Sequence, residues 1–419
     1  MATLLRPLAS RSGRNLLCHG PPSAIFRPST CLPQRRTFQT APPPTTIPDY
    51  AFAFDIDGVL LHSSTPVPGA SETLHDLRAA RIPFILLTNG GGTSETARVA
   101  DLSAKLNLDL DLDQFIQSHT PFADIHEYHE KTVLVIGGDY DNCARVARED
   151  YGFQNVVTPA DLITAYPDIW PFAKVFKDYY AQFARPLPPH LTTQKSLNPN
   201  DHPLTHNLKI DAIFVYNDPR DWALDLTLTI DLLLSHAGHL GTLSPLNNNS
   251  NLPNNGYQQD SQPPLLLSNP DLWWSSSYHL PRLGQGGFHA ALRGLWSTIT
   301  NNTADLQTRT FGKPMQGTYE FAERRLRGYR KKLFGQVGLN DPLRRVYMVG
   351  DNPASDIRGA NGYVSPFGSE WKSVLVKTGV YREGTSANGF GGEKPTKVLQ
   401  DVTEAVRWGM EDAEKARAG

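Results

Sequence analysis

The chain has 419 residues, of which 39% are apolar and 20% are charged, and its formal net charge is −2. This length and composition indicate a globular protein with one large domain or two smaller ones. The near-neutral charge argues against bulk binding to nucleic acid, and the three cysteines are too few for a disulfide scaffold. No apolar run approaches the roughly 20 residues that a membrane-spanning helix needs.

The first 48 residues differ from the rest in charge. They contain six arginines and no acidic residue, which leaves a net charge of −8 for the remainder of the chain. Arginine, serine and leucine without acids are typical of a mitochondrial transit peptide, which we expect over residues 1–38 and which would direct the protein to the matrix. A basic tail without a targeting role is the alternative. Residues 39–48 are rich in proline and threonine and are predicted to form a linker.

Strands and helices are predicted to alternate from residue 50 onward. The apolar runs that predict core strands lie at 50–54, 83–87, 114–118, 345–349 and 373–376. Helical patterns at 71–80 and 94–106 separate the first three runs. This rhythm favours an α/β fold with a Rossmann-like, doubly wound parallel sheet. We expect its core at 49–119 and 301–405, followed by a tail at 406–419.

The residues between the two parts of the core, 120–300, are predicted to form an inserted α/β domain with strands of its own. These strands are expected at 132–136, 212–216 and 265–267. Within the insert, residues 245–264 are rich in Asn, Gln, Pro and Ser, which predicts a disordered loop. Residues 186–203 predict a second, milder loop.

Polar, glycine-flanked residues follow four of the predicted core strands. The carboxyl ends of parallel strands form one edge of the sheet, where ligands bind. Carboxylates that converge there repel one another unless a cation lies between them, and oxygen-only ligands favour Mg²⁺. For the first pair of aspartates, a turn held by Asp side chains is the alternative. The residues are Asp55, Asp57, Thr88, Asn89, Asp351, Asp356 and Thr378.

Two of these features, and a lysine further along the chain, allow two interpretations each. Thr88 and Asn89 offer a hydroxyl and backbone N–H groups for a phosphoryl oxygen, but the same residues can simply begin a helix. Lys313 stands between Gly312 and Pro314, where it either neutralises an anion or is a solvated surface lysine.

Histidines and a basic segment complete the candidates. His119, His126 and His129 have the spacing of one helix face, but without cysteine or a zinc motif we expect no metal site there. The basic residues of segment 324–332 predict a solvated helix face, with a contact to phosphate or anionic lipid as the alternative.

The order of these features (aspartate pair, threonine, lysine, aspartate pair) resembles the haloacid dehalogenase (HAD) superfamily of aspartate-nucleophile hydrolases. The segments that carry the resemblance are Asp55-Ile56-Asp57-Gly58-Val59-Leu60, Leu87-Thr88-Asn89-Gly90, Ser268-Asn269-Pro270-Asp271, Gly312-Lys313-Pro314 and Gly350-Asp351-Asn352-Pro353-Ala354-Ser355-Asp356-Ile357. They are similar to subfamily IIA, the NagD-like group, in which a large α/β cap domain is inserted at the position of residues 120–300. Residues 216–222 and 230–234 are similar to the mitochondrial branch named after cat eye syndrome critical region protein five.

The resemblance implies a Mg²⁺-dependent phosphatase that acts on a small phosphorylated metabolite. It assigns Asp55 as the nucleophile that forms an aspartyl-phosphate and Asp57 as the general acid and base. Thr88, Asn89 and Lys313 would hold or neutralise the phosphoryl group.

The same resemblance implies the ligands of the metal. Asp55, the backbone carbonyl of Asp57 and Asp351 would bind Mg²⁺, and Asp356 would orient the water around it. In the cap, Asn269 and Asp271 are candidate contacts to the leaving group, with a plain turn as the alternative.

Other functions remain compatible with the sequence. The chain could be a non-catalytic or regulatory binding protein on the same scaffold, or a phosphotransferase that uses the same aspartyl-phosphate. In the mitochondrial branch a similar hydrolase can accompany a phosphatidyltransferase-type domain, which by analogy points to mitochondrial glycerophospholipid metabolism. A homodimer formed through the cap is a further expectation from the resemblance.

Overall fold

The computed structural model describes residues 47–187, 208–274, 278–381 and 394–418. The expected transit peptide, most of the linker and most of the loop at 186–203 lie outside the described residues. No helix within the described ranges is both long enough and apolar enough to cross a bilayer.

Six parallel strands form the core sheet in the order β15-β14-β13-β1-β4-β5. The direction of winding reverses between β1 and β13, so the sheet is doubly wound and the predicted fold class is confirmed. The strands are β1 (Tyr50–Phe54), β4 (Phe84–Leu87), β5 (Phe115–Ile116), β13 (Arg345–Gly350), β14 (Glu370–Val376) and β15 (Lys397–Leu399).

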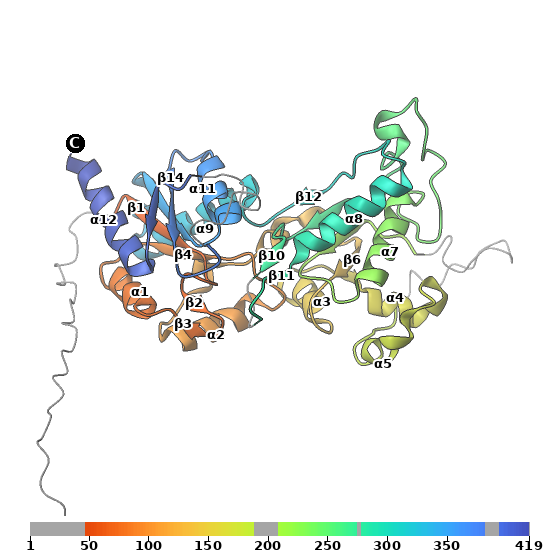
Figure 1. Ribbon diagram of the computed structural model, residues 1–419, viewed down its shortest axis with the longest axis horizontal. Coiled ribbons are helices and arrows are strands. Elements are labelled where there is room, and N and C mark those ends of the chain that lie inside the picture. Colours follow the sequence, from red (N-terminus) through yellow and green to blue (C-terminus); the bar gives the residue numbers. More distant parts are fainter. Residues whose placement is uncertain (1–46, 188–207, 275–277, 382–393, 419) are drawn as a thin grey trace, which may run out of the picture. The chain divides into compact units, whose positions relative to one another are not determined.

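Helices cover both faces of the core sheet (Figure 1). Successive side chains of β1 point to opposite faces. Phe52 and Phe54 pack against α1, α2 and α12, and Ala51 and Ala53 pack against α9 and α11, so all five residues of β1 are buried. The core helices are α1 (Ala70–Ala79), α2 (Glu95–Leu106), α9 (Gln316–Phe334), α10 (Gln336–Asn340), α11 (Arg358–Gly362) and α12 (Val402–Ala418).

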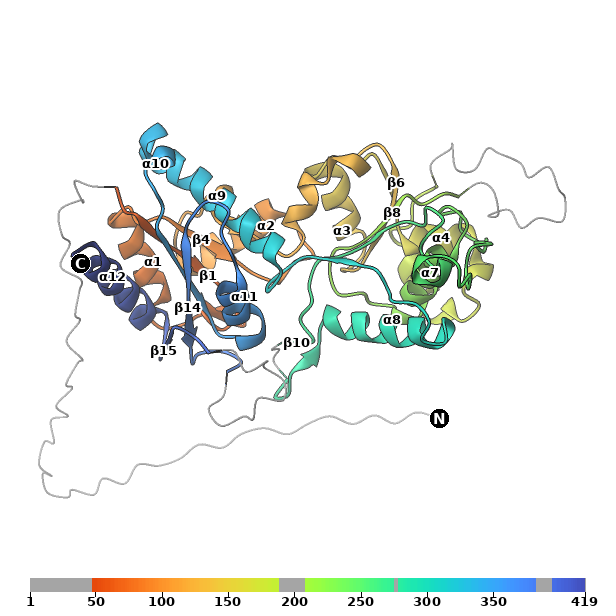
Figure 2. The same cartoon turned by 90° about the horizontal axis from the view of Figure 1, so that it is seen from above.

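The insert forms a second parallel sheet, in the order β12-β9-β8-β6-β7, with helices on both faces (Figure 2). Its winding reverses between β6 and β8. The strands are β6 (Thr132–Ile136), β7 (Asn155–Val157), β8 (Ala212–Val215), β9 (Leu265–Leu267) and β12 (Arg309–Thr310). The helices are α3 (Asn142–Arg145), α4 (Pro159–Ala165), α5 (Lys177–Tyr180), α7 (Trp222–Leu234) and α8 (Gln285–Ile299).

Two antiparallel hairpins accompany the two sheets. They pair β2 (Leu61–His62) with β3 (Thr65–Pro66), and β10 (Trp273–Trp274) with β11 (Arg282–Leu283).

Two expected boundaries and one expected loop differ from the structure. The cap sheet continues to β12, beyond the boundary expected at residue 300. Residues 406–418 are not a tail but the larger part of α12, which buries Val406 and Ala413 against the core. The Asn-rich residues 245–264 are held by specific bonds rather than disordered: the Asn254 amide donates to the carbonyl of Asp305 at 2.9 Å. The polar composition of this loop predicted disorder because composition does not show which backbone groups lie within reach of its side chains.

Candidate active site

Three aspartates meet where the winding of the core sheet reverses. Asp55 follows β1 and Asp351 follows the neighbouring β13, and the backbone N–H of Asp55 donates to the carbonyl of Val349 at 2.9 Å. Asp356 lies in the π-helical turn η8 (Pro353–Ile357). All three are buried, and one carboxylate oxygen of each lies within 4.8 Å of the other two. The structure thus brings together three of the predicted site residues.

Glycine at position 58 allows the loop after β1 to lie against Asp351. Its φ is 91°, and a Cβ there would stand 2.5 Å from Oδ2 of Asp351. The backbone N–H of Val380 donates to the same oxygen at 2.6 Å. The hydroxyl of Thr378 donates to the carbonyl of Gly58 at 2.5 Å. The loops that follow β1 and β14 therefore position Asp351 between them.

Lys313 is the buried counter-ion of this cluster. Its Nζ lies 2.6 Å from Oδ1 of Asp55 and 2.6 Å from Oδ1 of Asp356, and the side chain is almost fully buried. The alternative of a solvated surface lysine is therefore wrong. Burial opposes the charged form of Lys313, but the two carboxylates outweigh this effect and raise its pKa above the ordinary value. Lys313 consequently stays protonated.

The charges of the cluster do not balance. Three carboxylates face one ammonium group, and burial raises the pKa of Asp55 and raises that of Asp351 well above its usual range. This donor set consists of oxygen atoms with excess negative charge, which fits a hard divalent cation. Both oxygens of Asp356 have protein partners, namely Lys313 and the backbone N–H of Asn352 at 3.0 Å. Asp356 therefore suits a position next to the water around a cation better than one as a direct ligand.

Asp57 differs from the three buried aspartates because its side chain reaches solvent. The protein still surrounds much of its carboxyl group, and this desolvation raises its pKa, opposed mainly by the charge of Arg98. The structure therefore places Asp57 at the rim of the site, two residues beyond Asp55.

Thr88 and Asn89 follow β4, beside β1. The Thr88 hydroxyl accepts a bond from the Gly90 N–H at 3.0 Å. The Asn89 side chain is fully engaged: Oδ1 accepts from the Lys313 N–H at 2.7 Å, and Nδ2 donates to the Lys313 carbonyl and to Asp271, both at 2.9 Å. Asn89 therefore has only its backbone N–H for a phosphoryl oxygen, and its side chain anchors Lys313.

The two candidate residues of the cap have different positions. The Asp271 carboxylate contacts the Asn89 amide, and burial raises the pKa of Asp271 to about 7. The Asn269 side chain accepts from the Asp271 N–H at 2.8 Å, which closes a local turn. Asp271 therefore lies against the core loop that contains Asn89. Asn269 instead forms the plain turn that was the alternative interpretation.

His119 connects the core loop to the cap, a role that the spacing of the three histidines did not indicate. Its Nε2 accepts from the Gly92 N–H at 3.1 Å, and its Nδ1 lies 2.8 Å from the hydroxyl of Tyr151 in the cap, which in turn donates to Glu95. Burial lowers the pKa of His119 to about 4, so the ring is neutral. The position of His119 directly after the third core strand was the one feature of the sequence that could have indicated this role.

Within the described ranges, the one group of His, Cys, Asp or Glu side chains close enough together to hold a metal ion consists of the three buried aspartates and includes none of the histidines. The basic segment is largely a salt-bridged helix face, as expected, because Arg324 pairs with Glu320 and Lys332 pairs with Asp111. Arg330 is the exception, since it is buried and donates to backbone carbonyls.

Known proteins resemble this chain over most of its length. Family profiles described as haloacid dehalogenase-like hydrolase and HAD-hydrolase-like match residues 52–154 and 310–405, which contain most of the core. A mitochondrial hydrolase of Saccharomyces cerevisiae is 39% identical over 386 residues, covering 89% of this chain and 97% of that protein.

Two further relatives match in part. A cardiolipin synthase (CMP-forming)/mitochondrial hydrolase fusion protein of Schizosaccharomyces pombe is 37% identical over 366 residues; the match covers 87% of this chain but about half, 53%, of that protein. The ribonucleotide monophosphatase NagD of Escherichia coli is 38% identical over 85 residues, which are 20% of this chain and 33% of NagD.

Proposed function

We propose a function from the premise that this chain belongs to the haloacid dehalogenase-like hydrolases and, within them, to the NagD-like group. The proposed function is that of a Mg²⁺-dependent phosphatase, which hydrolyses a small phosphomonoester through an aspartyl-phosphate. The family resemblance inferred from the motifs is confirmed, whereas the reaction and the roles of the residues are proposals.

One observation carries the proposal: Lys313 bridges Asp55 and Asp356 beside Asp351, with all four side chains buried. The ammonium group opposes the effect of burial on the pKa of Asp55, favours the charged form of its carboxyl group and holds it in one orientation. This is the state that a carboxylate nucleophile needs. An exposed acidic cluster would have no such fixed partner.

In this mechanism the Asp55 carboxylate attacks phosphorus and displaces the alkoxide of the substrate. Lys313 neutralises the charge around Asp55 and the phosphoryl group. Asp57 protonates the departing alkoxide and then takes a proton from the water that hydrolyses the aspartyl-phosphate. The Thr88 hydroxyl and the Asn89 N–H donate to phosphoryl oxygens.

The metal would be held by Asp55, Asp351 and the backbone carbonyl of Asp57. When bound, Mg²⁺ supplies positive charge that offsets the repulsion between the carboxylate and the phosphate. Asp356 would orient the water around the metal, and its own carboxylate is held by Lys313 and by the backbone N–H of Asn352. The cap excludes water from the reaction and brings Asp271 to the same loop.

The proposed location is the mitochondrial matrix. Two relatives are named mitochondrial hydrolases, and the N-terminal segment of this chain carries arginines without acids. A role in glycerophospholipid metabolism is the second candidate, because one relative joins a hydrolase of this kind to a cardiolipin synthase.

The test is phosphate release by the purified protein with Mg²⁺ and with EDTA. The substrates are nucleoside monophosphates, phosphoglycolate, glycerol phosphate and pyridoxal phosphate. We expect activity that EDTA abolishes and that Asp55→Asn lowers by at least about a thousandfold. Asp109→Asn, the same substitution at an exposed position of the core, serves as the control and should leave the rate unchanged.

Four results would contradict parts of this proposal. A rate for Asp55→Asn above about a thousandth of that of the wild type would contradict Asp55 as the nucleophile. Full activity in EDTA would contradict the metal requirement. Mg²⁺ binding without turnover of any substrate would favour the non-catalytic alternative, and phosphate transfer to added alcohols would favour the phosphotransferase.

A further inference from the structure

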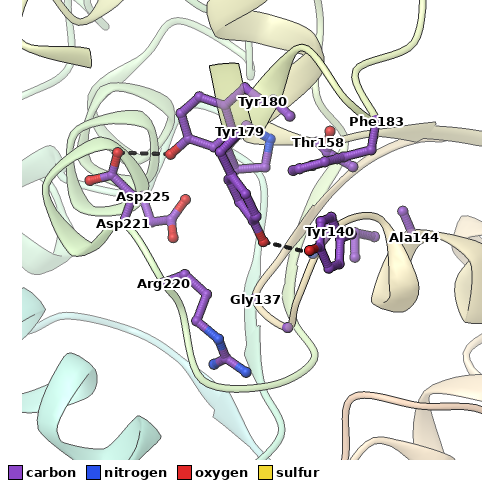
Figure 3. A pocket seen from close by; sticks show the side chains of 14 residues that line it. Gly137, Tyr140, Ala144, Thr158, Tyr179, Tyr180, Phe183, Arg220, Asp221 and Asp225 are labelled. Carbon is purple, nitrogen blue, oxygen red and sulfur yellow. Dashed lines mark hydrogen bonds between the residues drawn. The ribbon is translucent and has the colours of Figure 1, made fainter. Parts of the chain in front are cut away.

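The cap contains a cavity at the point where the winding of its own sheet reverses. The cavity has a volume of about 50 Å³, and Figure 3 shows the side chains that line it. It lies beyond the carboxyl ends of β6 and β8. Gly137 follows β6 and Arg220 lies beyond β8, and both line it. In open α/β sheets this is the position where ligands bind. The residues of the proposed phosphatase site do not line this cavity.

Aromatic rings form one side of the cavity. Phe183 and Tyr179 lie with ring centroids 5.0 Å apart at 75°, and Tyr140 lies 5.3 Å from Tyr179. The Tyr179 hydroxyl accepts from the Tyr140 N–H at 2.8 Å, which fixes these two residues relative to one another. Ring faces carry negative charge density and attract cations.

Two carboxylates form the opposite side, and only one of them has a structural role. Asp221 caps α7 by accepting from the Leu224 N–H at 3.2 Å, and it also accepts from the Tyr180 hydroxyl at 2.7 Å. Asp225 lies one turn later on α7 and is 5% exposed. Its carboxylate has no hydrogen-bond or ion-pair partner among the described residues. Figure 3 shows the two carboxylates side by side, near Tyr180 and Arg220.

A buried carboxyl group without a partner is costly and needs an explanation. Burial, reinforced by Asp221, raises the pKa of Asp225 well above its usual range. Arg220 does not relieve this cost, because its guanidinium donates to Asp139 at 2.8 Å and to the carbonyl of Asp218. The cavity therefore contains a carboxyl group that is ready to pair with a cation.

We propose that this cavity binds a compact organic ammonium group, with Asp225 as its counter-ion and the rings of Tyr140, Tyr179 and Phe183 as its walls. A water molecule needs about 10–15 Å³ of such space, so the volume accepts a group of only a few non-hydrogen atoms. A primary or quaternary alkylammonium ion meets both requirements, because it is small and presents either N–H donors or a polarised methyl surface. A hard metal ion would need more oxygen ligands than this cavity offers.

The test is isothermal titration of the full-length protein with ethylammonium chloride and with tetramethylammonium chloride. Sodium chloride at equal ionic strength and tert-butanol, a neutral molecule of similar shape, are the reference ligands. We expect saturable binding of at least one ammonium ion with a Kd of about 1–10 mM. We expect no saturable binding of either reference ligand.

Variants assign the binding to this cavity. Asp225→Asn keeps the shape of the side chain and should weaken binding at least about tenfold. Asp231→Asn makes the same change on the same helix away from the cavity and should leave the affinity unchanged. Phe183→Leu removes one wall, should weaken tetramethylammonium binding at least about threefold, and tests the proposal independently of how Asp225→Asn folds.

The proposal fails if neither ammonium ion binds saturably below about 100 mM, which would indicate a cavity filled by water alone. It also fails if tert-butanol binds as tightly as tetramethylammonium, or if Asp225→Asn retains the affinity of the wild type. Binding is measured here without substrate turnover, so the result does not depend on the proposed phosphatase activity.

Discussion

The substitution Asn89→Ala distinguishes a side chain that positions Lys313 from one that binds phosphate. In the structure the Asn89 amide makes three hydrogen bonds of 2.7–2.9 Å, two with the backbone of Lys313 and one with Asp271. Alanine would leave the Lys313 N–H, its carbonyl and the Asp271 carboxylate without these partners. The two backbone groups of Lys313 cannot turn to solvent without moving the loop, because Lys313 is buried, and the Asp271 carboxylate is half-buried.

The magnitude follows from the number of groups left unpaired. Each buried, unsatisfied polar group costs about 1–3 kcal/mol. Water can enter the space left by the amide and satisfy part of this demand, so we expect a loss of about 3 kcal/mol in the free energy of unfolding. A displacement of about 1 Å at a catalytic group lowers rates about a hundredfold, and we expect that loss in kcat.

The assays are urea unfolding and phosphate release at neutral pH. Asn340→Ala, at an exposed position of α10, is the control and should change the free energy of unfolding by less than about 0.5 kcal/mol. The reasoning is refuted if Asn89→Ala unfolds like the wild type. It is also refuted if KM rises while kcat is unchanged, since that result would assign the side chain to substrate binding.

Three further predictions concern stability and metal binding. Burial raises the pKa of Asp231 to about 6, so the folded protein binds this proton more tightly than the unfolded chain does. Ionisation of Asp231 therefore destabilises the fold progressively between about pH 4 and pH 6, and fully above that range. Asp231→Asn should raise the free energy of unfolding by at most about 3 kcal/mol at pH 8 and by less than about 1 kcal/mol at pH 4, and an equal effect at both pH values would contradict this origin. Arg330 donates to three backbone carbonyls, two of them through buried bonds, so Arg330→Met should cost about 3–5 kcal/mol in urea unfolding; an unchanged midpoint would show that these bonds contribute nothing. Gly58→Ala forces a Cβ to within 2.5 Å of Asp351 at a φ of 91°, and should raise the Mg²⁺ concentration for half-maximal activity at least about tenfold; an unchanged Mg²⁺ titration would refute the role of that close approach.

The order of the core elements could be predicted because each carries its own local signal. The alternation of apolar runs and helical patterns predicted β1, β4 and β13, and the structure has them within one or two residues of the expected bounds. In a parallel sheet the ends of adjacent strands must meet. Asp55 and Asp351 therefore had to lie together once β1 and β13 were neighbours.

The remaining parts of the site depend on contacts between distant parts of the chain. Asn89 and the Lys313 backbone are 224 positions apart, and local pattern gave no reason to pair them. Asp225 occupies an ordinary position on an apolar helix, and only the packing of α5 beside α7 shows that its carboxyl group lines a cavity. Arg330 belongs to a basic run whose other members are exposed or half-buried, so charge alone could not identify it as buried.

The loop after β4 links the proposed chemistry to the position of the cap. Asn89 bonds Asp271 on the cap side and Lys313 on the core side. Three residues further along, the Gly92 N–H donates to His119, whose ring contacts the cap residue Tyr151. Both ends of this loop therefore belong to hydrogen-bond networks that reach the cap, directly at Asp271 and through the His119 ring at Tyr151. A ligand that holds the cap against the core would also favour the loop conformation that anchors Lys313, and by the reciprocity of linked equilibria an anion bound at that loop would favour the closed cap.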